Sequence, residues 1–317
     1  MTQFAGQEPE SFGFEDIIYA KRDWVATVTI NRPQSYNAYT GHTLQEMTLA
    51  FRDAAWDDHI AVVVLTGAGD KAFCAGGDVK EYATEYTQRP RDYWKWMGLF
   101  MECHDILRSI GKPTIARLNG MVVGGGNEFN MACDLAIAAD HVRIRQVGTE
   151  VGSVAAGGAT QWLPLLVGDR RAREILWLDE WVDAEKALDW GLVNQVVPYA
   201  ALDDAVATMA AKLVDKFPEC MRYTKQQTNF WKDFSWYQTI GHARDWLSLH
   251  YTSLEPYEGM TAFTEKRRPD RVGVRQRAAS GGSSEFLWGP YQKTCPSCGA
   301  SGLPAQFTHC GQCGVAL

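Results

Sequence analysis

At residues 121–128 the sequence reads Met-Val-Val-Gly-Gly-Gly-Asn-Glu, a short β-branched run followed by three glycines and a candidate helix. A second glycine-bearing turn, Phe73-Cys74-Ala75-Gly76-Gly77-Asp78, follows the β-branched run at 62–66. Amides at a helix N-terminus lack partners and carry the positive end of the helix dipole, and glycine lets a ligand approach the backbone closely. Two such ends facing one point would stabilise a negatively charged oxygen. The alternative is that both turns serve backbone geometry alone.

Glu128 lies three residues after Gly125, one helical turn further on, so its carboxylate could reach the atom beside that oxygen. A general acid or base must lie within hydrogen-bond reach of the proton it moves, and a partly buried glutamate can have its pKa raised toward neutrality. The alternative is a capping or salt-bridging glutamate in a first helical turn. The two turns and Glu128 together indicate chemistry next to a carbonyl group.

The composition limits the class of protein. A chain of 317 residues has room for one large domain and an appendage. The net charge of −7 argues against a general nucleic-acid footprint. The sequence has no apolar run long enough for a bilayer, and residues 1–5 lack the features of a signal peptide. We therefore expect a cytoplasmic protein with no membrane or nucleic-acid partner, and we expect its isolated cysteines to be reduced.

Strand-like and helical segments alternate along the first half of the chain. The strand-like runs lie at residues 17–20, 25–30, 62–66, 114–118 and 135–139. Leu44, Met47 and Phe51 recur at helical spacing between them. This rhythm predicts an α/β fold with helices packed on a sheet. From residue 159 onward the pattern is mostly helical, and the aromatic stretch at 220–254 indicates packing and subunit contacts rather than ligand contacts.

Two Cys-x-x-Cys-Gly knuckles lie close to the C-terminus, with eleven residues between them, and their cysteines are Cys295, Cys298, Cys310 and Cys313. This spacing predicts a four-cysteine zinc ribbon. Two disulfides are the alternative, and His309 could replace one of the thiolates. Four thiolates fill a tetrahedron, so such a site would be structural, with no open position for a substrate.

The two glycine turns, with further stretches, resemble the crotonase superfamily, the relatives of enoyl-CoA hydratase and isomerase. The further stretches are 31–33, 37–38, 112–116, 133–135, 187–194 and 263–267. The resemblance covers about residues 14–269. It implies an α/β fold with a ββα spiral core at 14–200 and a helical region for oligomerisation and CoA contact at 201–268. The composition after this region predicts a linker at 269–290 and the zinc ribbon at 291–317.

The resemblance also implies a site for an acyl-CoA thioester. The amides of Ala75 and Gly125 would hold the thioester oxygen as an enolate forms, and Glu128 would move protons. No cofactor beyond a structural zinc is implied, and the assembly would be a homotrimer or homohexamer. The implied substrate-binding residues are Tyr36, Ala38, Gly76, Gly77, Asp78, Val79, Gly148, Ser153, Phe263 and Lys266.

The chain departs from the hydratase pattern at Gly148, where typical hydratases carry a second glutamate. Glu150 lies two residues later and could substitute if the chain were re-aimed. Gly148 with Ser153 is similar to two other branches, which contain 1,4-dihydroxy-2-naphthoyl-CoA synthase and 6-oxocyclohex-1-ene-1-carbonyl-CoA hydrolase. The second branch keeps a glutamate at the position of Glu128.

Aromatic residues suit a flat acyl group. Tyr93, Trp94 and Trp96 fall where this superfamily commonly lines its acyl pocket, although the same segment also carries a helical stripe typical of a core. Tyr251 matches a proposed proton donor of the naphthoyl-CoA synthase branch, and its alternative role is an interface aromatic.

These expectations lead to one main hypothesis and two alternatives. The main one is an enzyme that adds water to an enoyl-CoA and then opens an alicyclic oxo-enoyl-CoA ring. The first alternative is a conventional hydratase or isomerase of linear enoyl-CoA. The second is a scaffold subunit whose zinc ribbon docks an acyl-CoA enzyme.

Overall fold

The computed structural model describes residues 5–282, 285, 291–304 and 306–317. Part of the predicted linker, residues 283–284 and 286–290, lies outside this range. Within the described chain, no helix is both long enough and apolar enough to cross a lipid bilayer.

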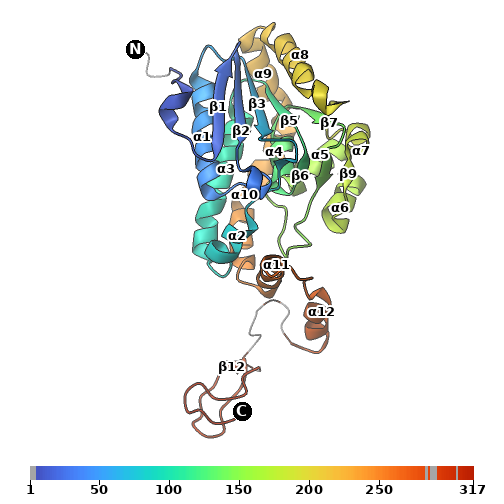
Figure 1. Cartoon of the computed structure of the whole chain (residues 1–317). Coiled ribbons are helices and arrows are strands. Elements are labelled where there is room, and N and C mark those ends of the chain that lie inside the picture. The colour runs from blue at the N-terminus through green and yellow to red at the C-terminus, as the bar shows by residue number, and fades with distance from the viewer. Residues whose placement is uncertain (1–4, 283–284, 286–290, 305) are drawn as a thin grey trace.

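Two sheets form the core of the fold (Figure 1). The larger sheet has six strands in the order β1 (Ile17–Arg22), β2 (Val25–Ile30), β3 (Val62–Gly67), β5 (Thr114–Leu118), β7 (Leu135–Ala139) and β10 (Gln195–Val197). The smaller sheet has four strands in the order β4 (Ala72–Cys74), β6 (Met121–Val123), β8 (Arg143–Arg145) and β9 (Val182–Asp183). All five predicted strands are present.

Successive strands divide between the two sheets in a repeating way. β3, β5 and β7 pair in parallel in the larger sheet, and the strand after each of them, β4, β6 and β8, pairs in parallel in the smaller one. β3 is buried along its whole length, as expected for a parallel strand covered on both faces. This repetition is the expected ββα spiral, and it brings the ends of β4 and β6 side by side.

Helices cover the sheets and extend the chain beyond them (Figure 1). Their bounds are α1 (Gly41–Trp56), α2 (Val79–Glu81), α3 (Pro90–Ser109), α4 (Gly125–Ala132), α5 (Ala159–Val167), α6 (Asp169–Leu178), α7 (Ala184–Trp190), α8 (Leu202–Val214), α9 (Pro218–Thr228), α10 (Phe230–His250), α11 (Leu254–Thr264) and α12 (Arg271–Ala279). Thr40 caps α1 through a capping box with Thr43, and the predicted stripe of Leu44, Met47 and Phe51 is fully buried.

The helix α12 corrects the predicted linker, because it occupies nine residues of the segment expected to be irregular. The Asp270 carboxylate caps it by accepting a hydrogen bond of 2.8 Å from the amide of Gly273. Arg271 anchors the helix to the core by donating to the carbonyl oxygen of Glu150 at 2.9 Å. The helical region therefore continues to Ala279.

The aromatic side chains of α10 divide into two groups. Trp236 is fully buried, whereas Trp231 and Tyr237 are exposed. The packing role is thus confirmed for Trp236, and a subunit contact remains the prediction for the exposed residues.

Glycine holds the two candidate turns together at backbone distance. A Cβ on Gly126 would lie 2.1 Å from the carbonyl oxygen of Cys74, and a Cβ on Gly76 would lie 3.1 Å from the amide nitrogen of Gly125. Gly76 also has a φ of +88°, which L side chains rarely adopt. The end of β4 and the start of α4 therefore touch without intervening side chains.

Replacing Gly126 with alanine should separate these turns. We expect Gly126→Ala to lower the free energy of unfolding by about 2–3 kcal/mol, because the new methyl group overlaps a backbone oxygen that cannot rotate away. Urea unfolding monitored by circular dichroism measures this. The control is Gly241→Ala in α10, where a Cβ would meet nothing within 4 Å; it should be neutral or stabilising by about 0.5–1 kcal/mol. Equal stabilities of the two variants would contradict the proposed close contact.

Candidate active site

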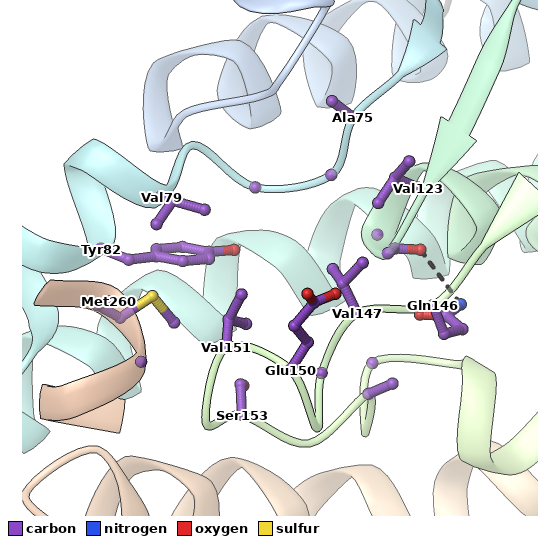
Figure 2. A pocket seen from close by; sticks show the side chains of 18 of the residues that line it. Ala75, Val79, Tyr82, Val123, Gln146, Val147, Glu150, Val151, Ser153 and Met260 are labelled. Atoms are coloured by element: carbon purple, nitrogen blue, oxygen red, sulfur yellow. Dashed lines mark hydrogen bonds between the residues drawn. The ribbon is translucent and has the colours of Figure 1, made fainter. Parts of the chain in front are cut away.

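A cavity of about 510 Å³ lies between the two glycine turns and the loop that follows β8 (Figure 2). Its lining includes the sequence-predicted residues Glu128, Ala75, Gly125, Tyr251, Tyr36, Gly76, Gly77, Val79, Gly148, Ser153 and Phe263. The structure thus brings together residues that lie more than 200 positions apart in the chain. Ala38, Asp78 and Lys266 do not belong to this lining.

The amide of Ala75 is already used inside the protein, which corrects the expectation that it binds an oxygen of a ligand. It donates to the carbonyl oxygen of Tyr36 at 3.0 Å. Gly77 is placed differently, because the amide of Tyr39 donates to Gly76 O and the amide of Asp78 donates to Tyr39 O. In such a parallel bridge the amide of the middle residue, Gly77, points away from Tyr39.

Gly77 and Gly125 therefore offer the unpaired amides at this end of the cavity. Gly125 is the first residue of α4, so its N–H has no acceptor within the helix. Among the described residues, neither amide has a hydrogen-bond partner. Both residues line the cavity. The pair can donate to an anionic oxygen there, where the dipole of α4 adds positive potential.

Glu128 is held at the cavity wall with only 5% of its surface exposed. Its Oε1 accepts a hydrogen bond of 3.3 Å from the amide of Ala159, and a Cβ on Gly157 would lie 3.0 Å from Oε2. Burial raises the pKa of Glu128 to about 7, and the amides of Ala159 and Gly157 oppose this shift. Glu128 can therefore exchange a proton near neutral pH.

The backbone of the following loop fills the space beside Gly148. A Cβ on Gly148 would lie 3.2 Å from both the amide nitrogen of Ala155 and the carbonyl oxygen of Ser153. The amide of Ser153 also donates to Gly148 O at 2.8 Å. A side chain at this position would therefore require the loop to shift by a few tenths of an ångström.

Glu150 lies on the same loop, and its carboxylate points into the cavity (Figure 2). It forms an ion pair with Arg145, which also lines the cavity, and lies 4.0 Å from the guanidinium of Arg271. A turn carries this residue, in which the amide of Glu150 donates to Val147 O at 3.2 Å. The cavity thus contains a second carboxylate, held by arginine.

Aromatic side chains form one wall of the cavity. Tyr93 and Trp96 line it as predicted, and Tyr251 stacks on Tyr93 with a ring-centroid distance of 3.9 Å. The hydroxyl of Tyr251 lies 3.2 Å from that of Ser153. Trp94, by contrast, points elsewhere: its indole N–H donates to Asp245 at 2.8 Å and its ring stacks on Arg244.

The chain is similar to known proteins over most of its length. Residues 20–272 match the enoyl-CoA hydratase/isomerase family. The chain belongs to this family.

Three solved structures show how widely the resemblance extends. An enoyl-CoA hydratase from Mycobacterium avium subsp. paratuberculosis K-10 is 26% identical, with a TM-score of 0.73 over 81% of this chain and 98% of its own. One from Bacillus anthracis is 29% identical, with a TM-score of 0.64 over 80% and 98%. An enoyl-CoA hydratase subunit from Geobacillus kaustophilus HTA426 is 31% identical, with a TM-score of 0.65 over 81% and 97%. The fold and the enzyme class of the chain are therefore those of enoyl-CoA hydratases and isomerases.

In this member of the enoyl-CoA hydratase/isomerase family, three residues predicted to bind substrate have structural roles or lie outside the cavity. Asp78 caps α2 through the amide of Lys80 and pairs with Arg32 at 3.2 Å. The carbonyl oxygen of Ala38 accepts a hydrogen bond from the same guanidinium. Lys266 is exposed outside the lining, whereas its neighbour Arg267 contributes to it.

Sequence reasoning missed several residues of the cavity, including Arg145, Gln146, Trp181 and Met260. Arg145 and Gln146 come at the end of β8 and just after it, and β8 is the third strand of the small sheet. The repeated spiral was the one signal that could have found them, because it predicts that the chain after β8 lies beside the turns after β4 and β6.

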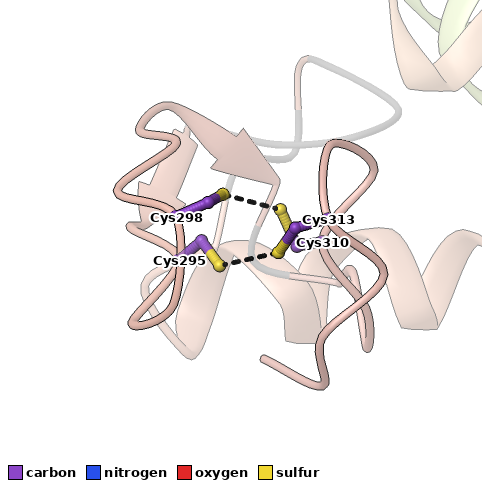
Figure 3. A group of neighbouring side chains, drawn as sticks. All are labelled: Cys295, Cys298, Cys310 and Cys313. Atoms are coloured by element: carbon purple, nitrogen blue, oxygen red, sulfur yellow. Dashed lines mark hydrogen bonds between the residues drawn. The ribbon is translucent and has the colours of Figure 1, made fainter.

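The four C-terminal cysteines form a cluster outside the matched region (Figure 3). The sulfur atoms of Cys295 and Cys313 are 3.6 Å apart, and those of Cys298 and Cys310 are 3.7 Å apart. These separations are too long for disulfides. They agree with the edge of about 3.8 Å of a tetrahedron with Zn–S bonds of about 2.3 Å.

The two knuckles repeat the same backbone pattern. The amide of Gly299 donates to Cys295 O at 3.0 Å, and the amide of Gly314 donates to Cys310 O at 2.8 Å. The φ angles of Gly299 and Gly314 are +75° and +73°. The glycine after each knuckle therefore serves a tight turn.

The pKa of Glu128 makes stability depend on pH. Because the folded-state pKa is raised from 4.5 to about 7, the protonated form is favoured in the folded protein, and stability falls as pH rises from about 4.5 through 7. We expect the stability of the wild type relative to Glu128→Gln to fall by about 3 kcal/mol between pH 4.5 and 8. Denaturant unfolding of both proteins across this range measures it. A constant difference would contradict the buried, proton-exchanging carboxyl group.

Proposed function

We propose that this protein adds water to an enoyl-CoA thioester and that its substrate is an alicyclic oxo-enoyl-CoA whose ring it then opens by hydrolysis. The observation that carries the proposal is the convergence of three features on one cavity. These are the free amides of Gly77 and Gly125 and the buried carboxyl group of Glu128, whose pKa is about 7.

The hydration step uses the amides and the carboxylate together. The thioester oxygen accepts hydrogen bonds from the N–H groups of Gly77 and Gly125, while Glu128 takes a proton from water. The hydroxide oxygen bonds to the β-carbon, and the electron pair of the double bond moves to the thioester oxygen as an enolate. Protonation of the α-carbon completes the addition. Each amide donor to such an oxyanion is worth roughly 3 kcal/mol.

Ring opening would use the same oxyanion site. A second water attacks the ring carbonyl carbon, and the bond between this carbon and the α-carbon breaks. The electron pair of that bond again becomes the thioester enolate, and the former ring carbonyl becomes a carboxylic acid. The α-carbon then takes up the proton that the attacking water released. Both steps thus pass through one stabilised species. Glu150, held by Arg145, is the carboxylate suited to orient the second water.

The acyl end of the cavity favours the alicyclic substrate, because Tyr93, Trp96 and Phe100 form a flat aromatic wall. Gly148 leaves the site without the second glutamate of typical hydratases. A conventional hydratase or isomerase of linear enoyl-CoA is the second candidate, and the names of the similar solved structures support it equally. The scaffold hypothesis would not require a buried carboxyl group beside two free amides.

The remaining proposals concern binding and assembly. Phe263 and Arg267 are placed to contact the CoA portion of the substrate, and the exposed aromatics of α10 would contact other subunits in a homotrimer or homohexamer. The four cysteines would hold one structural Zn²⁺, with Cys295, Cys298, Cys310 and Cys313 as the ligands and no position left for a substrate.

Replacing Glu128 should remove the proton transfer but preserve the thioester-binding amides. We expect Glu128→Gln to lower kcat by about 100-fold or more, and wild-type kcat/KM to rise with pH through about 7 as the base becomes ionised. Turnover of crotonyl-CoA and 6-oxocyclohex-1-ene-1-carbonyl-CoA, followed by mass spectrometry, measures this. The control is Glu102→Gln, an exposed carboxylate on α3. Unchanged rates would remove Glu128 from the mechanism, and turnover of the linear substrate alone would favour the conventional hydratase.

Metal analysis should find about one zinc ion per chain. Cys310→Ser should abolish this binding because it removes a buried thiolate, whereas His309→Ala should preserve it. A chain ending at Ser280 should bind no zinc and still give the circular dichroism and melting temperature of the folded core. Zinc retained by Cys310→Ser, or lost in His309→Ala, would contradict the four-thiolate site.

A further inference from the structure

A tyrosine hydroxyl lies beside the amide of Gly125. A Cβ on Gly125 would lie 1.9 Å from the hydroxyl oxygen of Tyr39, so this oxygen occupies the place of a side chain on that glycine. The amide nitrogen and the Cβ position are bonded to the same Cα. A hydroxyl in the Cβ place is therefore a close neighbour of the N–H group.

Gly77 shows the same arrangement with a different tyrosine. A Cβ on Gly77 would lie 1.8 Å from the hydroxyl oxygen of Tyr82. Figure 2 shows this hydroxyl pointing into the cavity, between the turn that carries Ala75 and the loop that carries Val151. Each of the two free amides is thus accompanied by one phenol, and both phenols line the cavity.

The two tyrosines lie close together in the cavity wall, since both rings contact Trp96. Tyr39 belongs to the bridge that brackets Gly77, and Tyr82 begins a π-helical turn, Tyr82–Tyr86. Each phenol is therefore beside one of the free amides, and all four groups open onto the same cavity.

Both phenols are fixed in place by packing. The ring of Tyr39 packs edge-to-face on Phe129 at 5.4 Å and stacks on Trp96 at 6.4 Å, and the ring of Tyr82 meets Trp96 edge-on at 4.9 Å. Within the described chain, no short hydrogen bond links either hydroxyl to another residue. A buried hydroxyl group normally has a partner, and each O–H can rotate about its C–O bond to meet one.

Neighbouring charge and burial keep these hydroxyls neutral. Burial raises the pKa of Tyr39 well above its usual value, and the Glu128 carboxylate raises it further. Burial raises the pKa of Tyr82 in the same direction. The phenols therefore stay protonated donors across the pH range in which Glu128 titrates, and they do not compete with it for protons.

We propose that the hydroxyls of Tyr39 and Tyr82 donate hydrogen bonds to the thioester oxygen, completing a four-donor oxyanion site with the amides of Gly77 and Gly125. This inference rests on the proposed function, because it requires a thioester in the cavity. On binding, the two hydroxyls rotate about their C–O bonds to meet the substrate oxygen. The bonds strengthen as the enolate forms, because negative charge accumulates on that oxygen.

The test compares Tyr39→Phe, Tyr82→Phe and the double variant with the wild type. The matched control is Tyr86→Phe, which removes a phenol hydroxyl that donates to Glu81 outside the cavity. The probe is the carbonyl stretching frequency of bound crotonyl-CoA or 6-oxocyclohex-1-ene-1-carbonyl-CoA, measured by difference infrared spectroscopy with a ¹³C-labelled thioester. We expect a shift to lower frequency in the wild type and in Tyr86→Phe, and a smaller shift in each cavity variant.

The kinetic expectation is specific to the transition state. Each cavity variant should lose about 10- to 100-fold in kcat, with KM changed by less than about 3-fold, because the donors bind the enolate more strongly than the ground-state thioester. Melting temperatures establish that the variants are folded, and the binding constant of the thioester establishes that they are loaded.

Three outcomes would overturn the inference. If the folded Phe variants show the same carbonyl shift and the same rates as the wild type, the two hydroxyls serve packing alone. If kcat falls only with 6-oxocyclohex-1-ene-1-carbonyl-CoA and the thioester carbonyl frequency is unchanged, the two hydroxyls contact the ring oxygen instead. If the wild type itself neither shifts the carbonyl frequency nor turns over either thioester, the proposed function fails together with this inference, and that result is distinct from a failure of the Phe variants alone.

Discussion

The close contact between two glycine turns is the constraint on which the site depends. Gly126 lies against the carbonyl oxygen of Cys74, and Gly76 lies against the amide of Gly125. No side chain fits between them, so the end of β4 and the start of α4 are held at backbone distance. The parallel pairing of β4 with β6 fixes the register of this contact. The sheets therefore position two amides that neither turn could position alone.

Burial sets the chemistry of the one carboxyl group beside these amides. Glu128 sits in the first turn of α4, where the helix dipole and two backbone amides favour its charged form, yet burial is the larger effect and raises its pKa to about 7. A more exposed glutamate would remain ionised and lose the ability to return a proton. Glu150 is partly exposed and forms an ion pair with Arg145. The cavity thus holds two carboxylates in different environments.

Periodicity and spacing predicted five strands of the larger sheet, the core stripe of α1 and the cysteine cluster. The glycine turns and the family resemblance predicted part of the cavity lining. The sequence did not show whether the amide of Ala75 or that of Gly77 is free, because this depends on which amide already donates to the Tyr36–Tyr39 segment. It also missed α12, whose cap at Asp270 looks like part of a polar linker when its partner is unknown. The family resemblance placed Trp94 and Asp78 at the site. Their partners, Asp245 and Arg32, come from distant segments that no local pattern reveals.

The absence of a glutamate at position 148 and the two phenols beside the free amides suit the same kind of reaction. A hydratase with two glutamates divides proton transfer between them, and its oxyanion site then has only to polarise the thioester. Here the loop at 153–155 occupies the space beside Gly148, and Glu128 is the carboxyl group closest in environment to a general acid or base. Breaking a carbon–carbon bond to the α-carbon demands a better-stabilised enolate than adding water does, because a carbanion leaves. A cavity with more donors at the thioester oxygen suits that demand, and glycine at 77 and 125 leaves the space in which the phenols fit.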